Sequence, residues 1–151
     1  MLKGIDPLLT PELLKVLAEM GHGDEIVIAD ANFTAASLAV GKPIVRLPGA
    51  GVERASQAVL SLLALDAAVA QPVAFMQVSE YPDGTLSALQ RRMLAWLQQA
   101  GHAEPAQCEA TERFAFYERV RGAFAIVLTS ELQPYGNFLY KKGVIGEALV
   151  P

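Results

Sequence analysis

The chain of 151 residues is 52% hydrophobic and 19% charged, and its net charge is −4. That length is enough for one domain with a hydrophobic core and hardly enough for two. Disordered chains are poor in apolar residues, and proteins that bind nucleic acids or anionic membranes carry basic surfaces. Composition and charge therefore exclude disorder and argue against a nucleic-acid or membrane partner.

Cys108 is the single cysteine of the sequence, so an intramolecular disulfide is excluded, and no cluster of cysteines and histidines indicates zinc. The N-terminal residues lack the basic and apolar regions of a signal peptide. No window reaches the ~18 uninterrupted apolar residues of a membrane helix. We therefore expect a soluble, cytoplasmic protein without a metal.

The first predicted helix begins at Thr10, which can cap it, with Pro11 at the first helical position. Apolar residues at helical spacing follow, and the glycines of the 21–23 segment end the helix. The 25–30 segment is a short β-branched run that ends in a carboxylate. It predicts a buried strand with Asp30 at its C-terminal tip.

Strands and helices alternate along the rest of the chain. We expect strands at 43–47, 73–78, 123–128 and 136–142, helices at 52–65, 85–100 and 112–121, and a short segment at 32–40. This alternation is typical of βαβ units. The predicted fold is a single α/β domain over residues 1–151, with three layers (αβα) and a mostly parallel central sheet. Ligands of such sheets bind beyond the carboxyl ends of the strands, which makes Asp30 and the residues after Leu128 candidates.

The 47–51 loop lies between a predicted strand and a predicted helix, as a dinucleotide-binding fingerprint would. Arg54 stands where that fingerprint needs glycine or alanine, and no acidic residue ends the next strand at the usual distance. An ordinary tight turn is therefore favoured over a nucleotide site.

His22 and Asp30 are the first candidate site residues. A histidine titrates near neutral pH and can give or take a proton, so His22 is either a catalytic acid or a cap at the C-terminus of the first helix. Asp30 either accepts hydrogen bonds from substrate hydroxyls or caps the segment that follows it. Both interpretations stay open for each residue.

A second group of candidates lies in the C-terminal half. Arg113 and Tyr117 share one face of a predicted helix, where aromatic surface beside a guanidinium suits a polyhydroxylated ligand. The alternative is an amphipathic helix with solvated charges. The 135–137 segment (Tyr-Gly-Asn) predicts a turn, in which Gly136 permits an unusual backbone conformation.

Four segments in the same order resemble the L-fucose mutarotase and D-ribose pyranase family. They are the run 10–25 (TPELLKVLAEMGHGDE), the strand tip 30–33, the RFAFYER block at 113–119, and Tyr-Gly-Asn at 135–137 with Lys-Lys-Gly-Val at 141–144. The RFAFYER block is similar to the fucose mutarotase branch. Two features depart from it: Asn32 stands where that branch has histidine, and the 41–57 region diverges.

The resemblance implies an enzyme that interconverts the α and β anomers of a free monosaccharide, without cofactor or metal. Its matching positions imply that His22 is the proton donor. They also imply the sugar contacts Asp30, Arg113, Tyr135, Gly136 and Asn137, with Tyr117 as a further contact. The alternatives are pyranose–furanose interconversion of a pentose such as ribose and a monosaccharide-binding protein without catalysis.

Family members assemble into ring-shaped decamers, so the resemblance also implies a homo-oligomer. The apolar excess of the sequence would then form subunit interfaces, for which Met93, Trp96, Phe114 and Phe116 are the predicted residues.

The chemistry agrees with this interpretation. Opening a pyranose ring needs one proton delivered to the ring oxygen and another removed from the anomeric hydroxyl, after which rotation lets the ring close on the other face. General acid–base catalysis typically contributes ~10²–10⁴-fold to such a step. The sequence assigns no acceptor for the anomeric proton.

Overall fold

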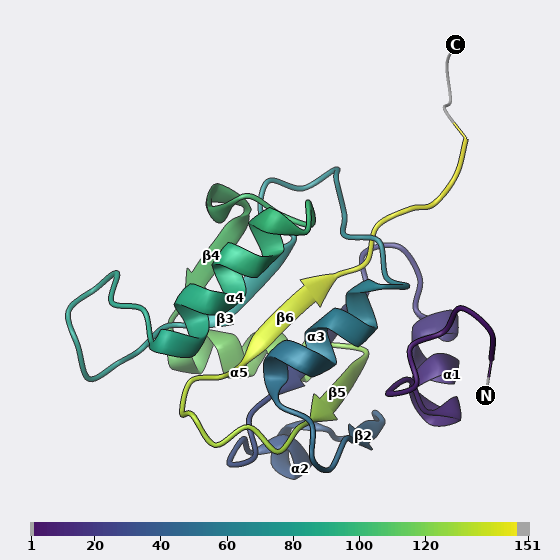
Figure 1. The fold of residues 1–151 in the computed structure, drawn as a ribbon. Helices are drawn as coiled ribbons and strands as arrows, with labels where there is room; N and C mark the ends of the chain where they lie inside the picture. The colour runs from purple at the N-terminus through teal and green to yellow at the C-terminus, as the bar shows by residue number, and fades with distance from the viewer. Residues whose placement is uncertain (1, 148–151) are drawn as a thin grey trace.

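The computed structural model describes residues 2–147, in which six strands form one sheet in the order β2-β5-β1-β6-β3-β4 (Figure 1). The strands are β1 (Glu25–Ala29), β2 (Ile44–Arg46), β3 (Val73–Met76), β4 (Cys108–Thr111), β5 (Ala125–Leu128) and β6 (Phe138–Lys141). β1 pairs in parallel with β5, as does β2 with β5 and β3 with β4. Only β6 opposes its two neighbours, β1 and β3. The prediction of a mostly parallel sheet is confirmed.

Helices cover both faces of this sheet, which confirms the three predicted layers. The helices are α1 (Pro11–Glu19), α2 (Ala35–Leu38), α3 (Val52–Leu60), α4 (Ala88–Gln99) and α5 (Arg113–Gly122), with a 3₁₀ turn at Pro105–Gln107. α1, α3 and α4 pack on one face, and α2 and α5 pack on the other (Figure 1). Within β1, Ile26 and Ile28 belong to the first layer of the core and Val27 and Ala29 to the second. Side chains that alternate between two buried faces explain the continuous apolar run.

Local signals fix several element ends. The Thr10 hydroxyl accepts a hydrogen bond from the Leu13 amide at 3.1 Å, as the predicted cap of α1 requires. The 47–51 segment is a tight turn in which the Ala50 amide donates to the Leu47 carbonyl, and α3 follows directly. This agrees with the turn that was favoured over a nucleotide-binding loop.

Two predicted helices differ in their bounds from the observed ones, and one observed strand has no predicted counterpart. The helix predicted at 52–65 ends at Leu60, because the chain turns there and Leu65 forms a bridge with Lys142 beside the sheet. The helix predicted at 85–100 starts only at Ala88, where Ser87 caps it. β4 was not predicted, because its half-exposed sequence at the sheet edge carries no apolar run.

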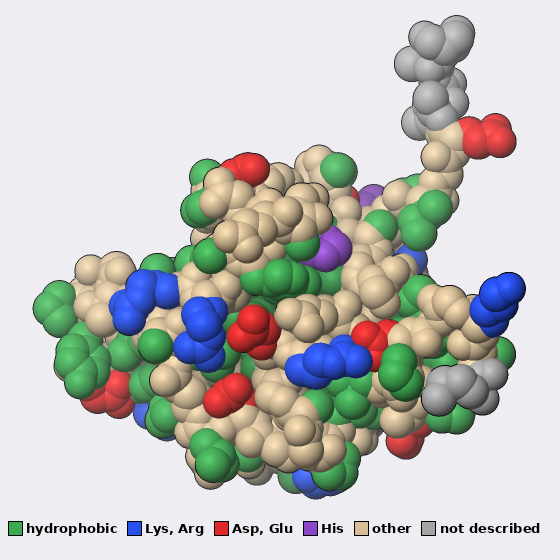
Figure 2. Space-filling view, viewed as in Figure 1, with side chains coloured by type: hydrophobic (Ala, Val, Ile, Leu, Met, Phe, Trp, Pro, Cys, Tyr) green, Lys and Arg blue, Asp and Glu red, His purple; other side chains and the backbone are tan. Residues whose placement is uncertain are grey.

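The predicted interface residues divide into two groups. Met93 and Phe116 are fully buried in the core of their own chain, so the prediction that they face a neighbouring subunit is wrong. Phe114 is 66% exposed and Trp96 is half-buried. On the face drawn in Figure 2, positive and negative side chains are interspersed among hydrophobic ones. Within residues 2–147, no helix is long and apolar enough to cross a membrane.

Candidate functional site

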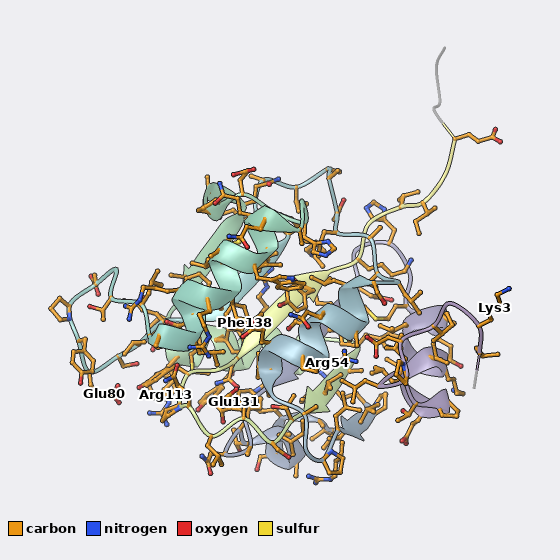
Figure 3. All side chains as sticks on the ribbon, in the orientation of Figure 1. Lys3, Arg54, Glu80, Arg113, Glu131 and Phe138 are labelled. Atoms are coloured by element: carbon orange, nitrogen blue, oxygen red, sulfur yellow. The ribbon has the colours of Figure 1, made fainter. Side chains whose placement is uncertain are left out.

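A pocket of about 300 Å³ lies at the edge of the sheet where β1 ends and β6 begins. Its lining comprises Asp30, Asn32, Phe33, Met76, Glu80, Arg113, Tyr117, Pro134, Tyr135 and Asn137. Five of the seven predicted site residues are in this lining, and Gly136 lies between two of them. Figure 3 shows Glu80 and Arg113 close together, one from the β3–α4 loop and one from the start of α5. The structure thus brings together all the predicted site residues except His22.

Asp30 and Asn137 form the buried floor of the pocket. The Asn137 side-chain amide donates to Asp30 Oδ2 at 3.0 Å, and the Asp30 backbone amide donates to Asn137 Oδ1 at the same distance. The residues are 107 positions apart and meet because β1 and β6 are antiparallel neighbours. This reciprocal pair fixes both side chains before any ligand binds.

Burial raises the pKa of Asp30, against the opposing effect of hydrogen bonds from Asn32, Asn137 and the Gly136 amide. Asp30 Oδ1 accepts the Asn32 amide at 3.0 Å, so the side chain caps the turn that directly follows β1, although α2 begins only at Ala35. The same side chain also lines the pocket, so the two interpretations of Asp30 do not exclude each other.

Arg113 reaches the pocket because α5 begins at that residue. The Glu112 carboxylate caps the helix by accepting the Phe114 and Ala115 amides, which turns the chain into α5 just before Arg113. Arg113 Nε donates to the Tyr117 hydroxyl at 3.1 Å, and this bond raises the pKa of the guanidinium. The guanidinium also lies 5.6 Å from the centre of the Tyr117 ring. A cation and an aromatic face therefore stand side by side at the pocket wall.

Tyr135 is held in a backbone conformation that residues other than glycine seldom adopt, with φ at 61°. The side-chain amide of Gln90, which is fully buried, donates to the Tyr135 carbonyl at 3.1 Å and to the Met76 carbonyl at 2.8 Å. At the other end, the Tyr135 hydroxyl donates to both carboxylate oxygens of Glu80 at 2.6 Å. A strained backbone of this kind persists only where surrounding contacts hold the residue in place. Here the contacts with Gln90 and Glu80 hold Tyr135 at the pocket.

Gly136 leaves no room for a side chain. A Cβ atom there would lie 2.9 Å from Leu89 Cδ2 and 3.1 Å from the Gln133 carbonyl oxygen. The predicted need for glycine therefore comes from close approach of α4, and Gly136 is not among the residues with positive φ.

His22 lies at the opposite edge of the sheet. Its Nε2 is 3.2 Å from Asp66 Oδ2, and its side chain is 53% exposed whereas that of Asp66 is 6% exposed. The Ala68 amide and His22 lower the pKa of Asp66, the amide having the larger effect. Residues 24–30 of extended chain span roughly 20 Å, so His22 and Asp30 of one chain cannot contact the same small ligand.

The structure rules out one of the two interpretations of the His22 side chain, that of a helix cap. Met20 is the C-cap of α1, and the polar contact of the His22 ring is with Asp66 instead of a helix carbonyl. Sequence reasoning missed Asp66, Glu80 and Gln90. A Ser-x-x-Gln capping box at 87–90 was a readable signal for Gln90, but only for its role at the start of α4.

Fold and pocket together define a small α/β protein with a pocket at the carboxyl edge of a mostly parallel sheet, lined by both aromatic and charged side chains. Residues 3–145 match the model of the RbsD / FucU transport protein family, and the chain belongs to this family. In residues 2–147 no group of three or more histidine, cysteine or acidic side chains could hold a metal ion.

Several relatives cover nearly the whole chain. An L-fucose mutarotase of Actinobacillus pleuropneumoniae is 46% identical over 95% of this chain and 97% of its own length. The human fucose mutarotase is 44% identical over 95% of this chain and 94% of its own.

Solved structures agree with these relatives. The fucose mutarotase of Streptococcus pneumoniae in complex with L-fucose is 36% identical, with a TM-score of 0.85 over 96% of this chain and 100% of that one. Bacillus subtilis RbsD complexed with D-ribose, at 23% identity and a TM-score of 0.72 over 97% of this chain and 100% of that one, shares the fold.

Proposed function

We propose that this protein is a mutarotase that interconverts the α and β anomers of L-fucose or a closely related monosaccharide. The observation that carries the proposal is the pre-formed Asp30–Asn137 pair beside Arg113 in a polar pocket, in a chain 46% identical to an L-fucose mutarotase. Carboxylate, amide and guanidinium are the groups that bind sugar hydroxyls in a fixed orientation. The rings of Tyr117 and Phe33 offer apolar surface to the sugar ring.

The proposed proton donor is His22, supplied to each pocket by a second copy of the chain. Among residues 2–147 the pocket lining contains no histidine, and His22 itself stands half exposed on a buried carboxylate that orients its ring. Donor and pocket lie at opposite edges of one sheet, so a complete site needs two copies joined head to tail. Head-to-tail contacts that close produce rings, which supports a ring-shaped homo-oligomer such as a decamer.

We also propose a cytoplasmic location. The single cysteine, Cys108, is poorly suited to a surface disulfide, because burial raises the pKa of its thiol to about 11. This supports a protein built for a reducing compartment.

The proposal is tested by NMR saturation transfer between the anomers of L-fucose. Wild-type protein should accelerate exchange well above the uncatalysed rate, and a panel of aldoses identifies the preferred sugar. Faster pyranose–furanose exchange of D-ribose than anomer exchange of L-fucose would favour the pentose activity. Binding of L-fucose without faster exchange would contradict the mutarotase and indicate a sugar-binding protein.

Acidification should weaken sugar binding through Asp30. Because burial raises the pKa of Asp30 above 3.8, its carboxylate becomes protonated at a higher pH than that of an exposed aspartate. The folded state then binds this proton more tightly than the unfolded state, so the contribution of Asp30 to stability is lost as pH rises through the raised pKa.

We therefore expect the affinity for L-fucose, measured by titration calorimetry, to decline between neutral pH and 3.8. The Asp30→Asn variant should bind more weakly and show no such decline over this range. An affinity that stays constant in the wild type down to that pH would refute the assigned role of Asp30.

A further inference from the structure

Ring opening requires a group that takes the proton of the anomeric hydroxyl. In the described part of the chain, two carboxylates line the pocket, those of Asp30 and Glu80. Each hydrogen bond to a carboxylate stabilises its charged form, so the carboxylate with fewer donors is the better proton acceptor. The hydrogen bonds of the two side chains distinguish them.

Both carboxylate oxygens of Asp30 already accept hydrogen bonds from separate donors. Its Oδ1 accepts the Asn32 amide, and its Oδ2 accepts the side-chain amide of Asn137, both at 3.0 Å. The side chain is also buried on the floor of the pocket. These contacts hold the side chain in one orientation and suit a fixed hydroxyl-binding group.

Glu80 differs from Asp30 in its exposure and in the number of its hydrogen-bond donors. It lies on the loop between β3 and α4, which extends from the left of the molecule in Figure 1, and its side chain is exposed at the pocket rim. Its one hydrogen-bond partner among residues 2–147 is the Tyr135 hydroxyl. The Gln90 side-chain amide holds Tyr135 in turn by donating to its backbone carbonyl. One shared hydroxyl proton therefore engages the Glu80 carboxylate, whereas the amides of Asn32 and Gly136 and the side chain of Asn137 all donate to Asp30.

The positive charge of Arg113 lies close to the same carboxylate. Both residues line the pocket, and Glu80 is among the groups that raise the pKa of the Arg113 guanidinium. The guanidinium can hold a sugar hydroxyl within reach of the Glu80 carboxylate. We therefore assign different roles to Arg113 at the pocket wall, to the Asp30–Asn137 pair on the floor and to Glu80 at the rim.

We propose that Glu80 is a catalytic residue that accepts the anomeric proton, an inference that rests on the mutarotase function proposed above. The anomeric hydroxyl gives its proton to a Glu80 oxygen, and its O–H electrons form the C=O bond of the aldehyde. The bond between C1 and the ring oxygen breaks, and that oxygen takes its electron pair and a proton from His22 of a second copy. After rotation about C1–C2, the reverse transfers close the ring and restore both residues.

The test is chemical rescue of Glu80→Ala. This variant should lower kcat for L-fucose anomer exchange by about 10²-fold, with KM changed far less, because a proton acceptor acts in the transition state. Sodium formate should then raise the rate along a saturating curve, since it fits the space left by the carboxylate. The Glu80→Gln variant, which fills that space, should be equally slow and should not respond to formate.

Asp83→Ala is the matched control. Asp83 lies on the same exposed loop, accepts a hydrogen bond from Gln77 at 2.8 Å, and does not line the pocket. It should exchange L-fucose at the wild-type rate, with no gain from formate over sodium chloride at equal ionic strength.

Each other outcome counts against the inference. A Glu80→Ala variant with wild-type kcat would overturn it, and so would a change confined to KM. A lowered kcat that formate does not raise would also overturn it, because Glu80 would then act by holding Tyr135. Failure of the mutarotase itself is recognised separately, since wild-type protein would then show no exchange.

Discussion

Replacing His22 by alanine is expected to slow L-fucose anomer exchange by about 10²–10⁴-fold, the usual contribution of a general acid. Binding should change little, because the proposed hydroxyl-binding groups lie at the other edge of the sheet from His22. Saturation transfer gives the rate, and titration calorimetry gives the affinity.

His102→Ala is the control for this variant. His102 is the other histidine of the chain, lies 5.4 Å from the Trp96 ring, and is not in the lining of the pocket. It should keep the wild-type rate. Wild-type exchange by His22→Ala would remove the proposed proton donor and leave the pocket as a binding site.

Mixed assemblies of two inactive variants should regain activity. His22→Ala keeps an intact pocket, and Arg113→Ala, changed at an exposed side chain, keeps an intact His22. If each site combines the pocket of one copy with the histidine of another, random equimolar assembly makes about one quarter of the sites complete. The exchange rate, measured below KM, should therefore rise from the low residual rate of the single variants to about a quarter of the wild-type rate.

The double variant His22→Ala/Arg113→Ala provides the control. Mixed with either single variant, it cannot complete a site, so its mixtures should stay as slow as their components. The variants must be co-expressed or refolded together so that copies exchange. Equal rates for the mixture of single variants and for these controls would show that the two copies do not share a site.

The sequence predicted much of this fold because buried strands and amphipathic helices have distinct periodicities. It could not predict the direction of β6, since the residue pattern of a four-residue strand does not show whether the strand runs parallel or antiparallel to its neighbours. It also missed β4, because an edge strand with half-exposed side chains needs no apolar run. The direction of β6 and the presence of β4 both depend on which strands become neighbours in the folded sheet.

The candidate site was predictable where residue type and chain position coincided. Asp30 ends a clear strand, and Arg113 with Tyr117 shares a helix face, so local patterns indicated them. Gln90 and Asp66 act through contacts with segments more than 40 positions away, 45 for Gln90 with Tyr135 and 44 for Asp66 with His22. Their roles arise only from tertiary structure, as does the separation of His22 from the pocket.

The reversed strand β6 joins the two halves of the proposed site. It starts directly after Asn137, and at its far end the Lys142 carbonyl accepts the Gly23 amide while the Lys141 carbonyl accepts the Asp66 amide. The four residues of β6 span roughly 13 Å, which is most of the distance between the pocket and the His22–Asp66 contact. Inserting one residue into β6 would turn every side chain beyond the insertion to the opposite face of the sheet. The contacts at the two ends of the strand could then not form together. In the head-to-tail assembly proposed above, the length of this strand therefore sets the spacing between the pocket of one copy and the histidine that the next copy supplies.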